Sequence, residues 1–159
     1  MNIVVRPACD DDACLIAELT RAAWRGKVAS GSSGHQEAPE RVAQQLRDGG
    51  AFLLLVNSVA VGSVRWMPHE LGAGVWDIMR MGVLPAFRGS NLSQHLLEAV
   101  IHQALASAVQ ELRLAVRSDQ PKLLDFYAAF GFELAEELEY SHANPAEPAP
   151  CIMRRVLRH

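Results

Sequence analysis

The chain contains 159 residues, of which 50% are hydrophobic and 21% are charged. At about 100–200 residues per domain this length predicts a single domain over residues 1–159, and the composition excludes a disordered, collagen-like or disulfide-dependent chain. The formal net charge of −3 lacks the basic excess that is typical of nucleic-acid partners, so no nucleic acid is expected.

The first part of the chain predicts a strand, a helix and a loop. An apolar run over residues 2–8 indicates the strand. Three aspartates at 10–12 provide capping side chains and negative charge for a helix start. Apolar residues recur behind them at helical spacing as far as Gly26. The Gly- and Ser-rich stretch 26–38 then predicts a flexible loop.

The next segment predicts a helix followed by a β-hairpin. Pro39 suits the first turn of a helix, and the glycine pair at 49–50 ends it. Residues 51–56 form a continuous apolar run, as in a strand that is covered on both faces. A tight turn at 57–58 connects this strand to another over 59–67.

The second half of the chain predicts two further helices among four strands. The longer helix carries apolar residues on one face at spacings of three and four. In chain order the elements are a strand over 74–84, a helix over 91–108, a strand over 112–117, a helix over 121–130, and strands over 132–140 and 151–157. The whole order predicts an α/β domain (mixed α+β), with a mixed sheet and helices on both faces.

Location is indicated by the apolar runs, the N-terminus and the cysteines. The longest apolar run has six residues, against about 20 for a membrane-spanning helix, so no membrane partner is expected. The N-terminus lacks the basic start and long apolar region of a secretory signal, which favours a cytoplasmic protein. The three cysteines, Cys9, Cys14 and Cys151, form no CxxC pair, and we expect them to be small buried thiols.

The most informative stretch is residues 83–93, where a strand ends, a turn follows and the longer helix begins. Free backbone N–H groups at a helix start bind anions. Gly89 allows a ligand close to the backbone, and Asn91 tolerates left-handed dihedral angles. The further side-chain donors are Arg88, Ser90 and Ser93. The stretch predicts a phosphate-binding turn, with an ordinary Asn or Ser helix cap as the alternative.

This stretch resembles the acyl-CoA-binding motif of the GNAT superfamily of N-acyltransferases. That motif runs from V-x-P into [RQ]-x-x-G-x-[GA] at a helix start. Val83 and Pro85 match V-x-P, and Arg88 matches the leading Arg or Gln. Asn91 and Ser93 stand where the family has Gly and Gly or Ala, so the match is partial.

A second stretch resembles the same family. Tyr127 lies four residues before Gly131-Phe132, as in the family's second signature, and residues 153–157 are similar to its last strand. The resemblance covers nearly the whole chain. It implies a GNAT-type single domain whose central, mostly antiparallel sheet has about six or seven strands and about four flanking helices, with a V-shaped splay between strands 4 and 5.

The resemblance also implies acetyl-CoA as cosubstrate, in the gap between residues 75–83 and 111–117. A bulge in the first of these strands would part the pair. Main-chain groups around Met81 and Val83 would pair with the pantetheine arm. The pyrophosphate would lie on Arg88, Gly89, Ser90, Asn91, Leu92 and Ser93. No metal is implied.

For catalysis, the resemblance implies direct transfer of the acetyl group to a primary amine in a ternary complex. Tyr127 matches the tyrosine that protonates the leaving thiolate in many members, and a phenol with a pKa of about 10 can do so. The alternative for Tyr127 is a place in the apolar seam of a short helix.

Asp77 is the candidate base that deprotonates the amine. It lies in an otherwise apolar alternating stripe, where a carboxylate needs a partner or a task, and its position matches a base glutamate in some family members. The candidate salt-bridge partners that would occupy it instead are Arg65, Arg80 and Arg113, and the other candidate bases, acting through water, are His69 and Glu70.

The alternative function is a non-catalytic GNAT-like domain that binds acyl-CoA or a partner as a sensor or regulator. The expected partner of the enzyme is a small-molecule or peptide amine, and the resemblance admits a homodimer. His95 and His102, seven residues apart, fit a solvated helix face better than a metal site.

Overall fold

The computed structural model describes residues 1–25, 37–69, 74–117, 120–138 and 149–157. Within these residues the elements follow the predicted order, with short 3-10 turns added before α1 and α3. They are β1 (Ile3–Pro7), η1 (Asp10–Asp12), α1 (Ala13–Trp24), α2 (Pro39–Asp48), β2 (Gly50–Val56), β3 (Val59–Pro68), β4 (Val75–Val83), η3 (Pro85–Phe87), α3 (Ser93–Ala106), β5 (Glu111–Val116), α4 (Lys122–Ala128), β6 (Glu133–Leu134) and β7 (Cys151–Val156).

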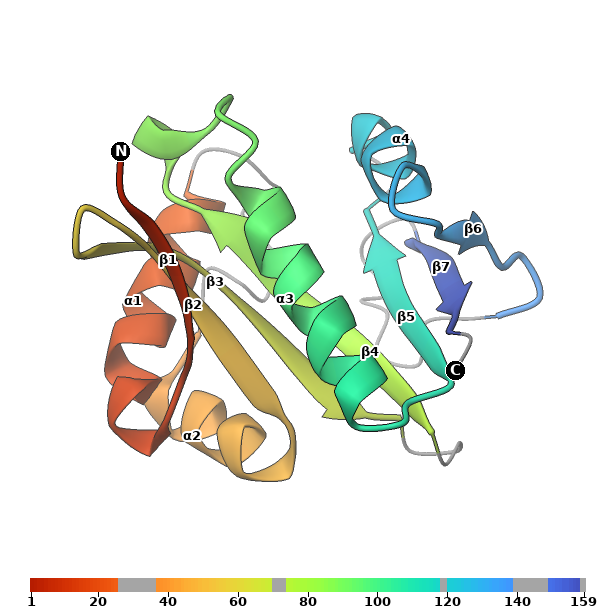
Figure 1. Cartoon of the computed structure of the whole chain (residues 1–159), viewed down its shortest axis with the longest axis horizontal. Helices are drawn as coiled ribbons and strands as arrows, with labels where there is room; N and C mark the ends of the chain where they lie inside the picture. The colour runs from red at the N-terminus through yellow and green to blue at the C-terminus, as the bar shows by residue number, and fades with distance from the viewer. Residues whose placement is uncertain (26–36, 70–73, 118–119, 139–148, 158–159) are drawn as a thin grey trace.

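The strands form one sheet in the order β1-β2-β3-β4-β5-β7-β6. Neighbouring strands are antiparallel except β4 and β5, which are parallel. In Figure 1, α3 crosses the near face of the sheet and α1 lies behind the sheet. We call these the α3 face and the α1 face. The mixed, mostly antiparallel sheet that the sequence predicted is confirmed.

The first hairpin forms for local reasons. Asn57 and Ser58 have φ of 50° and 70°, as a two-residue turn with the twist of its strands requires. The preceding strand β2 is buried on both faces, as its unbroken apolar run predicted. Phe52 and Leu54 join the core on the α3 face, while Leu53 joins the core on the α1 face.

The helices cover the two faces with separate apolar cores. On the α3 face, Leu96, Leu97 and Val100 of α3 are fully buried against the sheet. On the α1 face, Ile16 of α1 and Val42 of α2 pack on β2. No helix in the described part of the chain has the length and apolar character needed to cross a membrane.

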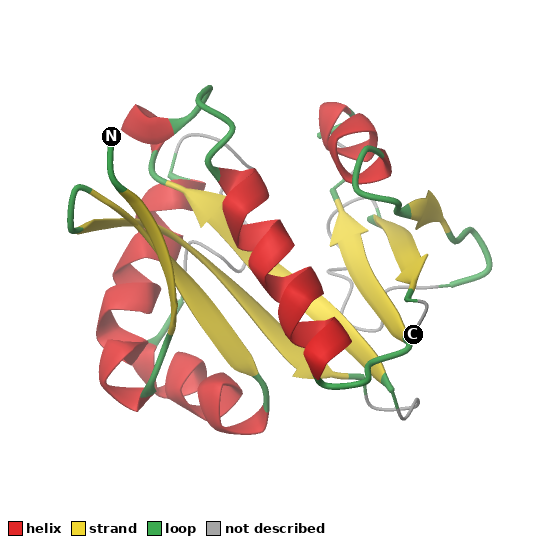
Figure 2. Cartoon of the chain, in the orientation of Figure 1, coloured by secondary structure: helices red, strands yellow, loops and turns green. Residues whose placement is uncertain are grey.

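The parallel pair β4–β5 is joined over only part of its length. Val75–Ile78 pairs with Glu111–Leu114, and no pairing follows beyond that point. On its other edge β4 carries a bulge, because Arg80 and Met81 both stand opposite Val64. Bulges bend a strand and increase its twist. Figure 2 shows the two strands together at one end and apart at the other, so the predicted splay is confirmed.

Two predictions fail in the described residues. The strand predicted over 132–140 is only Glu133–Leu134, because the chain turns at 135–138, where the Leu138 N–H donates to the Ala135 carbonyl. Its end at 139–140 lies outside the described residues. The cysteines are also exposed and free rather than buried, since each lies at an element's edge or on an outward face.

Candidate active site

The open end of the splay is bordered by the second half of β4. From Met79 to Val83 this strand pairs with β3 on one edge but has no β5 partner on the other. Its backbone groups on that edge are therefore available to a ligand that lies between the strands. Met81 and Val83 both belong to this stretch, and their side chains pack in the core on the α3 face.

The turn that follows β4 has the backbone of an anion-binding turn. Gly89 and Asn91 are left-handed, with φ of 87° and 56°. The N–H groups of residues 89–92 donate to no backbone carbonyl of the described chain. Nothing lies within 4 Å of the position that a Gly89 Cβ would take. Asn91 thus adopts a backbone conformation that glycine takes most easily, and the space beside Gly89 is open.

The other residues of the turn anchor it. Leu92 is buried in the core on the α3 face, and Ser93 is the first residue of α3, while Ser90 is exposed. The Arg88 guanidinium donates to the Ala23 carbonyl in the last turn of α1, where a cation also suits the helix dipole. Its side chain therefore ties the turn to α1 and does not extend toward the open N–H groups.

Tyr127 lies in α4 and is 8% exposed. Its ring packs edge-on against Phe126 and Phe132, in the same core as Leu112 and Leu114 of β5. Burial raises the pKa of the Tyr127 phenol to about 12, because a phenolate would be poorly solvated there. The side chain is neutral and carries a proton at any physiological pH.

Asp77 pairs with His69 and with none of the three arginines considered as partners. Its Oδ2 lies 2.8 Å from His69 Nδ1. Both side chains remain partly exposed, 35% for Asp77 and 23% for His69. The hairpin places them together, since the His69 N–H donates to the Val75 carbonyl. A carboxylate that accepts from Nδ1–H leaves Nε2 as the basic nitrogen of the ring.

Each of these arginines forms a salt bridge with a carboxylate other than that of Asp77. Arg65 and Arg80 both pair with Glu37. Arg113 Nε lies 2.5 Å from Glu111 Oε2, and its Nη1 lies 3.4 Å from His69 Nε2. Asp77 is therefore oriented by a histidine whose far nitrogen faces a cation.

The two candidate catalytic side chains lie on opposite faces of the sheet. Ile78 belongs to the core on the α3 face, so its neighbour Asp77 projects from the α1 face. Tyr127 packs on the α3 face. The eight candidate CoA-binding residues thus lie along the second half of β4 and the turn that follows it. The candidate acid and the candidate base lie on opposite faces of the sheet.

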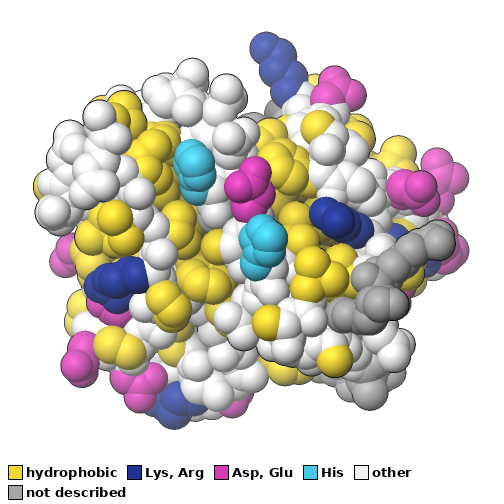
Figure 3. All heavy atoms as spheres, in the orientation of Figure 1, with side chains coloured by type: hydrophobic (Ala, Val, Ile, Leu, Met, Phe, Trp, Pro, Cys, Tyr) yellow, Lys and Arg dark blue, Asp and Glu magenta, His cyan; other side chains and the backbone are white. Residues whose placement is uncertain are grey.

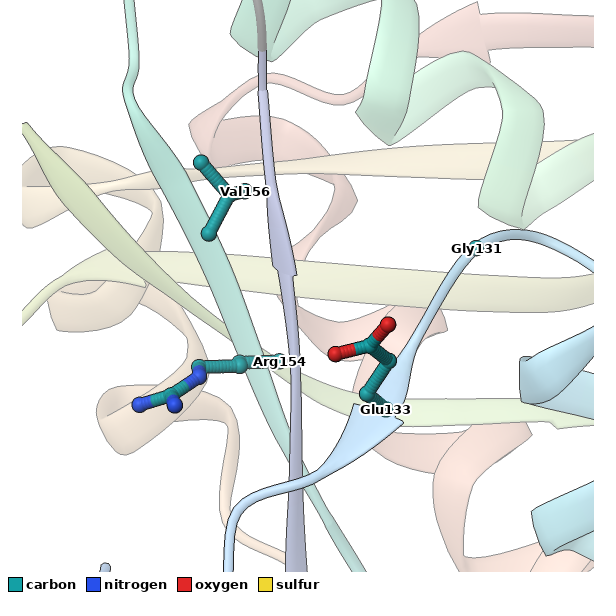
Figure 4. Close-up of a pocket in the computed structure, with 4 residues that line it drawn as sticks. All are labelled: Gly131, Glu133, Arg154 and Val156. Carbon is teal, nitrogen blue, oxygen red and sulfur yellow. The ribbon is translucent and has the colours of Figure 1, made fainter.

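On the α1 face, polar side chains continue from Asp77 across the C-terminal strands. Cα pairing aligns Asp77 with Arg113, Arg113 with Arg154, and Arg154 with Glu133. A shallow hollow of about 220 Å³ is lined there by Gly131, Glu133, Arg154 and Val156. Figure 4 shows Arg154 extending from β7 over β5, with Glu133 on the other side of β7.

Sequence reasoning missed two features of this region. The pairing of His69 with Asp77 was not foreseen, although two polar residues that flank the same hairpin connection were a usable signal. In the strand register Asp77 stands opposite Met67, two residues before His69. Glu37 was not considered at all, and its charge is buried through contacts that no local pattern indicates. Glu70, the other candidate base, lies outside the described residues.

The structure gives no metal site in the part of the chain that it describes: no cluster of three or more His, Cys, Asp or Glu residues there could hold an ion. Figure 3 shows two histidines beside an acidic side chain on the near face, over α3. His95, Glu98 and His102 are the α3 residues of these types.

Comparison with known proteins gives a consistent family. The acetyltransferase (GNAT) family model matches residues 16–132. Mycothiol acetyltransferase of Nocardioides sp. is 28% identical over 140 residues, which cover 79% of this chain and 48% of that protein. Mycothiol acetyltransferase of Streptomyces griseus is 26% identical over 126 residues, 79% of this chain and 41% of that one. The chain spans less than half the length of these curated relatives.

A solved structure agrees over its whole length. The PaiA N-acetyltransferase of Thermoplasma acidophilum in complex with coenzyme A superposes with a TM-score of 0.79 at 16% identity, covering 99% of this chain and 100% of that one. This likeness establishes the fold, and the family model covers well over half of the sequence. The chain therefore belongs to the acetyltransferase (GNAT) family.

Proposed function

We propose that the protein is an acetyl-CoA-dependent N-acetyltransferase that transfers the acetyl group directly to a primary amine. The observation that carries this proposal is the parting of β4 from β5 beyond Ile78 and Leu114, beside a turn with free N–H groups. An extended thioester arm needs backbone partners along a strand edge, and a pyrophosphate needs clustered N–H donors. The residues present fit both ends of such a molecule.

Acetyl-CoA would supply the activated acetyl group as a thioester. The β4 edge around Met81 and Val83 would pair with its pantetheine arm, and residues 88–93 would hold its pyrophosphate through their backbone. Asn91 has a left-handed backbone, as a glycine could have. Asn in place of the family's glycine would therefore still present the N–H donors of the turn. Arg88 and Leu92 would act by fixing the turn to α1 and to the core.

Asp77, together with His69, is proposed to remove the proton from the acceptor amine. An alkylamine has a pKa of about 10.4 and must become neutral to attack. The carboxylate and the imidazole are in contact at 2.8 Å, so a proton taken at either group can be shared by both. Their position on the α1 face means that the amine approaches from that side.

Tyr127 is proposed as the group that meets the leaving sulfur from the α3 face. Its pKa of about 12 keeps it protonated, but it holds that proton more tightly than a thiol with a pKa of about 8.5. The O–H therefore stabilises developing charge on the sulfur by donating a hydrogen bond, and the proton need not transfer completely.

The acceptor is proposed to be a polar amine, either a small molecule or a peptide end. From Asp77 it would extend over Arg113 toward the hollow beside Arg154 and Glu133. Charged lining of this kind suits hydroxyl, amide or charged groups better than an aromatic body. Because two relatives are named mycothiol acetyltransferase, the acceptor of those enzymes is among the first amines to test with this protein.

The test has a binding step and a turnover step. CoA at 100 times its Kd stabilises the folded state by about 2.7 kcal/mol, which for this length raises the Tm by about 5–11 °C. Release of free thiol is then measured with acetyl-CoA and a panel of polar amines. No Tm shift at millimolar CoA would contradict the proposal. Binding without thiol release for any amine would favour the non-catalytic alternative.

A further inference from the structure

A buried carboxylate outside the candidate catalytic pair lies against the bulge of β4. Glu37 lies two residues before the start of α2, and its side chain is 2% exposed. Its Oε1 contacts Arg65 Nη2 and lies 3.3 Å from Arg80 Nε. Its backbone carbonyl accepts from Arg21 Nη1 at 2.5 Å. Both the main chain and the carboxylate of Glu37 are therefore tied to neighbouring elements.

Arg65 fixes this carboxylate in space. It is fully buried and donates to Gln45 Oε1 at 2.7 Å and to Thr20 Oγ1 at 3.1 Å. These partners belong to α2 and α1, so the guanidinium is held by both helices of the α1 face. Because a buried cation needs its counter-charge, Glu37 has little freedom to leave this position.

Arg80 is the strained residue of the bulge. Its φ is 55°, a left-handed value that is unfavourable for a residue with a Cβ and costs glycine nothing. It lies two residues after Ile78, where the pairing with β5 ends. The backbone at Arg80 therefore turns β4 where the candidate CoA slot begins, and something must offset the cost of its conformation.

We propose that Glu37 is a positioning residue: its carboxylate, fixed by Arg65, holds Arg80 in the left-handed conformation that keeps β4 turned away from β5. The consequence for CoA binding rests on the function proposed above, whereas the hold on Arg80 does not.

The first arm of the test reads the backbone of the free protein. The Cα and Cβ chemical shifts of residue 80 distinguish left-handed from extended backbone. We expect left-handed shifts in the wild type and a move toward extended values in Glu37→Gln, which removes the charge at nearly constant volume. Left-handed shifts that persist unchanged in Glu37→Gln would overturn the proposal.

The second arm compares two substitutions that both remove the ion pair. Arg80→Gln keeps a Cβ and needs help to stay left-handed, whereas Arg80→Gly adopts that backbone unaided. We expect Arg80→Gln to raise the Kd for CoA about tenfold, and Arg80→Gly to raise it by much less. Equal weakening by the two substitutions would overturn the proposal, and so would no weakening by either.

Loss of stability is separated from loss of positioning by the double variant. Glu37→Gln leaves Arg65 buried without its carboxylate, which lowers the Tm whatever else it does. In Glu37→Gln/Arg80→Gly we expect the Tm to remain low while CoA affinity returns toward that of the wild type. Parallel changes of Tm and Kd through the wild type, Glu37→Gln, Arg80→Gly and the double variant would mean a purely structural role and would overturn the proposal. If Glu37→Gln does not fold, the two single Arg80 variants decide.

Failure of the proposed function gives a different pattern. If the wild type itself does not bind CoA, the proposed acetyl transfer is wrong, and the chemical shifts of residue 80 in the free proteins still decide whether Glu37 holds the bulge. If the wild type binds CoA and the shifts do not respond to Glu37→Gln, the role of Glu37 is wrong, and thiol release decides acetyl transfer independently.

Discussion

The two parts of the sheet are built differently. In the N-terminal part, β1–β4 have helices on both faces, and β2 is buried on each side. In the C-terminal part, α4 packs with the α3-face core, while polar side chains occupy the α1 face of β5 and β7. The parts are joined where Val75–Ile78 pairs with Glu111–Leu114.

The difference explains why the candidate site lies at the join. A strand that is paired on both edges and covered on both faces leaves neither a backbone edge nor a polar face for a ligand, so β2 and β3 can serve as a scaffold but not as a site. At the join, an unpaired strand edge, a turn with free donors and a partly exposed polar face come together. Each wall also supplies one candidate catalytic group, Asp77 from the first part and Tyr127 from the second.

The largest expected effect is on turnover, at the candidate catalytic group of the second part. Tyr127→Phe removes the O–H but keeps the ring that packs against Phe126 and Phe132. We expect kcat to fall about 10²–10³-fold, the range for loss of one positioned hydrogen-bond donor to developing charge, with the Kd for CoA and the Tm close to those of the wild type. Thiol release under saturating acetyl-CoA measures it, and an unchanged kcat would remove Tyr127 from the mechanism.

A leucine of the first part should contribute far more to stability than a leucine of the second part. Leu54 is fully buried in β2, whereas Leu134 of β6 is 50% exposed. We expect Leu54→Ala to lower the free energy of unfolding by about 2–5 kcal/mol, and Leu134→Ala to change it by about 0.5 kcal/mol or less. Urea unfolding measures both. Similar losses would mean that the C-terminal part is packed as tightly as the scaffold.

The third prediction concerns the turn at the join. Asn91→Val places a β-branched residue at a left-handed φ of 56°, which costs at least about 1–2 kcal/mol, so we expect the Kd for CoA to rise about tenfold. Asn91→Gly is the matched control and should bind at least as tightly as the wild type. Calorimetric titration with CoA measures both, and equal affinities would show that the backbone conformation at Asn91 does not set binding.

The smallest expected effect is on the pH dependence of stability, where one ion pair from each part of the sheet is compared. Hydrogen bonds from Arg6 lower the pKa of Asp12 to about 2, below its usual value of about 3.9. The folded state therefore binds this proton less tightly, and the pair's contribution is complete above about pH 4 and lost as the pH falls toward 2. Because Arg6 is 42% exposed, we expect only about 1 kcal/mol.

Glu137 and Arg154 provide the contrast in the C-terminal part. A backbone hydrogen bond, and then the charge of Arg154, lower the pKa of Glu137, but the carboxylate is fully solvated and we expect no measurable contribution to stability. The free energy of unfolding at pH 5 and pH 3 should therefore become less pH-dependent in Asp12→Asn and stay as in the wild type in Glu137→Gln. The reverse ranking would contradict the burial difference.

The sequence by itself determined the elements and their order. Spacing of apolar residues located α3 within two residues at each end, the unbroken run at 51–56 gave a strand buried on both faces, and Asn57-Ser58 gave the hairpin. These signals are local, because hydrophobic periodicity and turn chemistry act over a few residues. The resemblance in residues 83–93 was also local, and it led to the family before any contact was known.

Only the tertiary structure decided which polar groups meet. Asp77 had three arginines as possible partners, and strand pairing gave it His69 instead. Arg88 turned to the end of α1, and Glu37 became the buried partner of two cations. Such pairings join residues that are distant in sequence, and burial, not local propensity, sets their cost and their choice of partner.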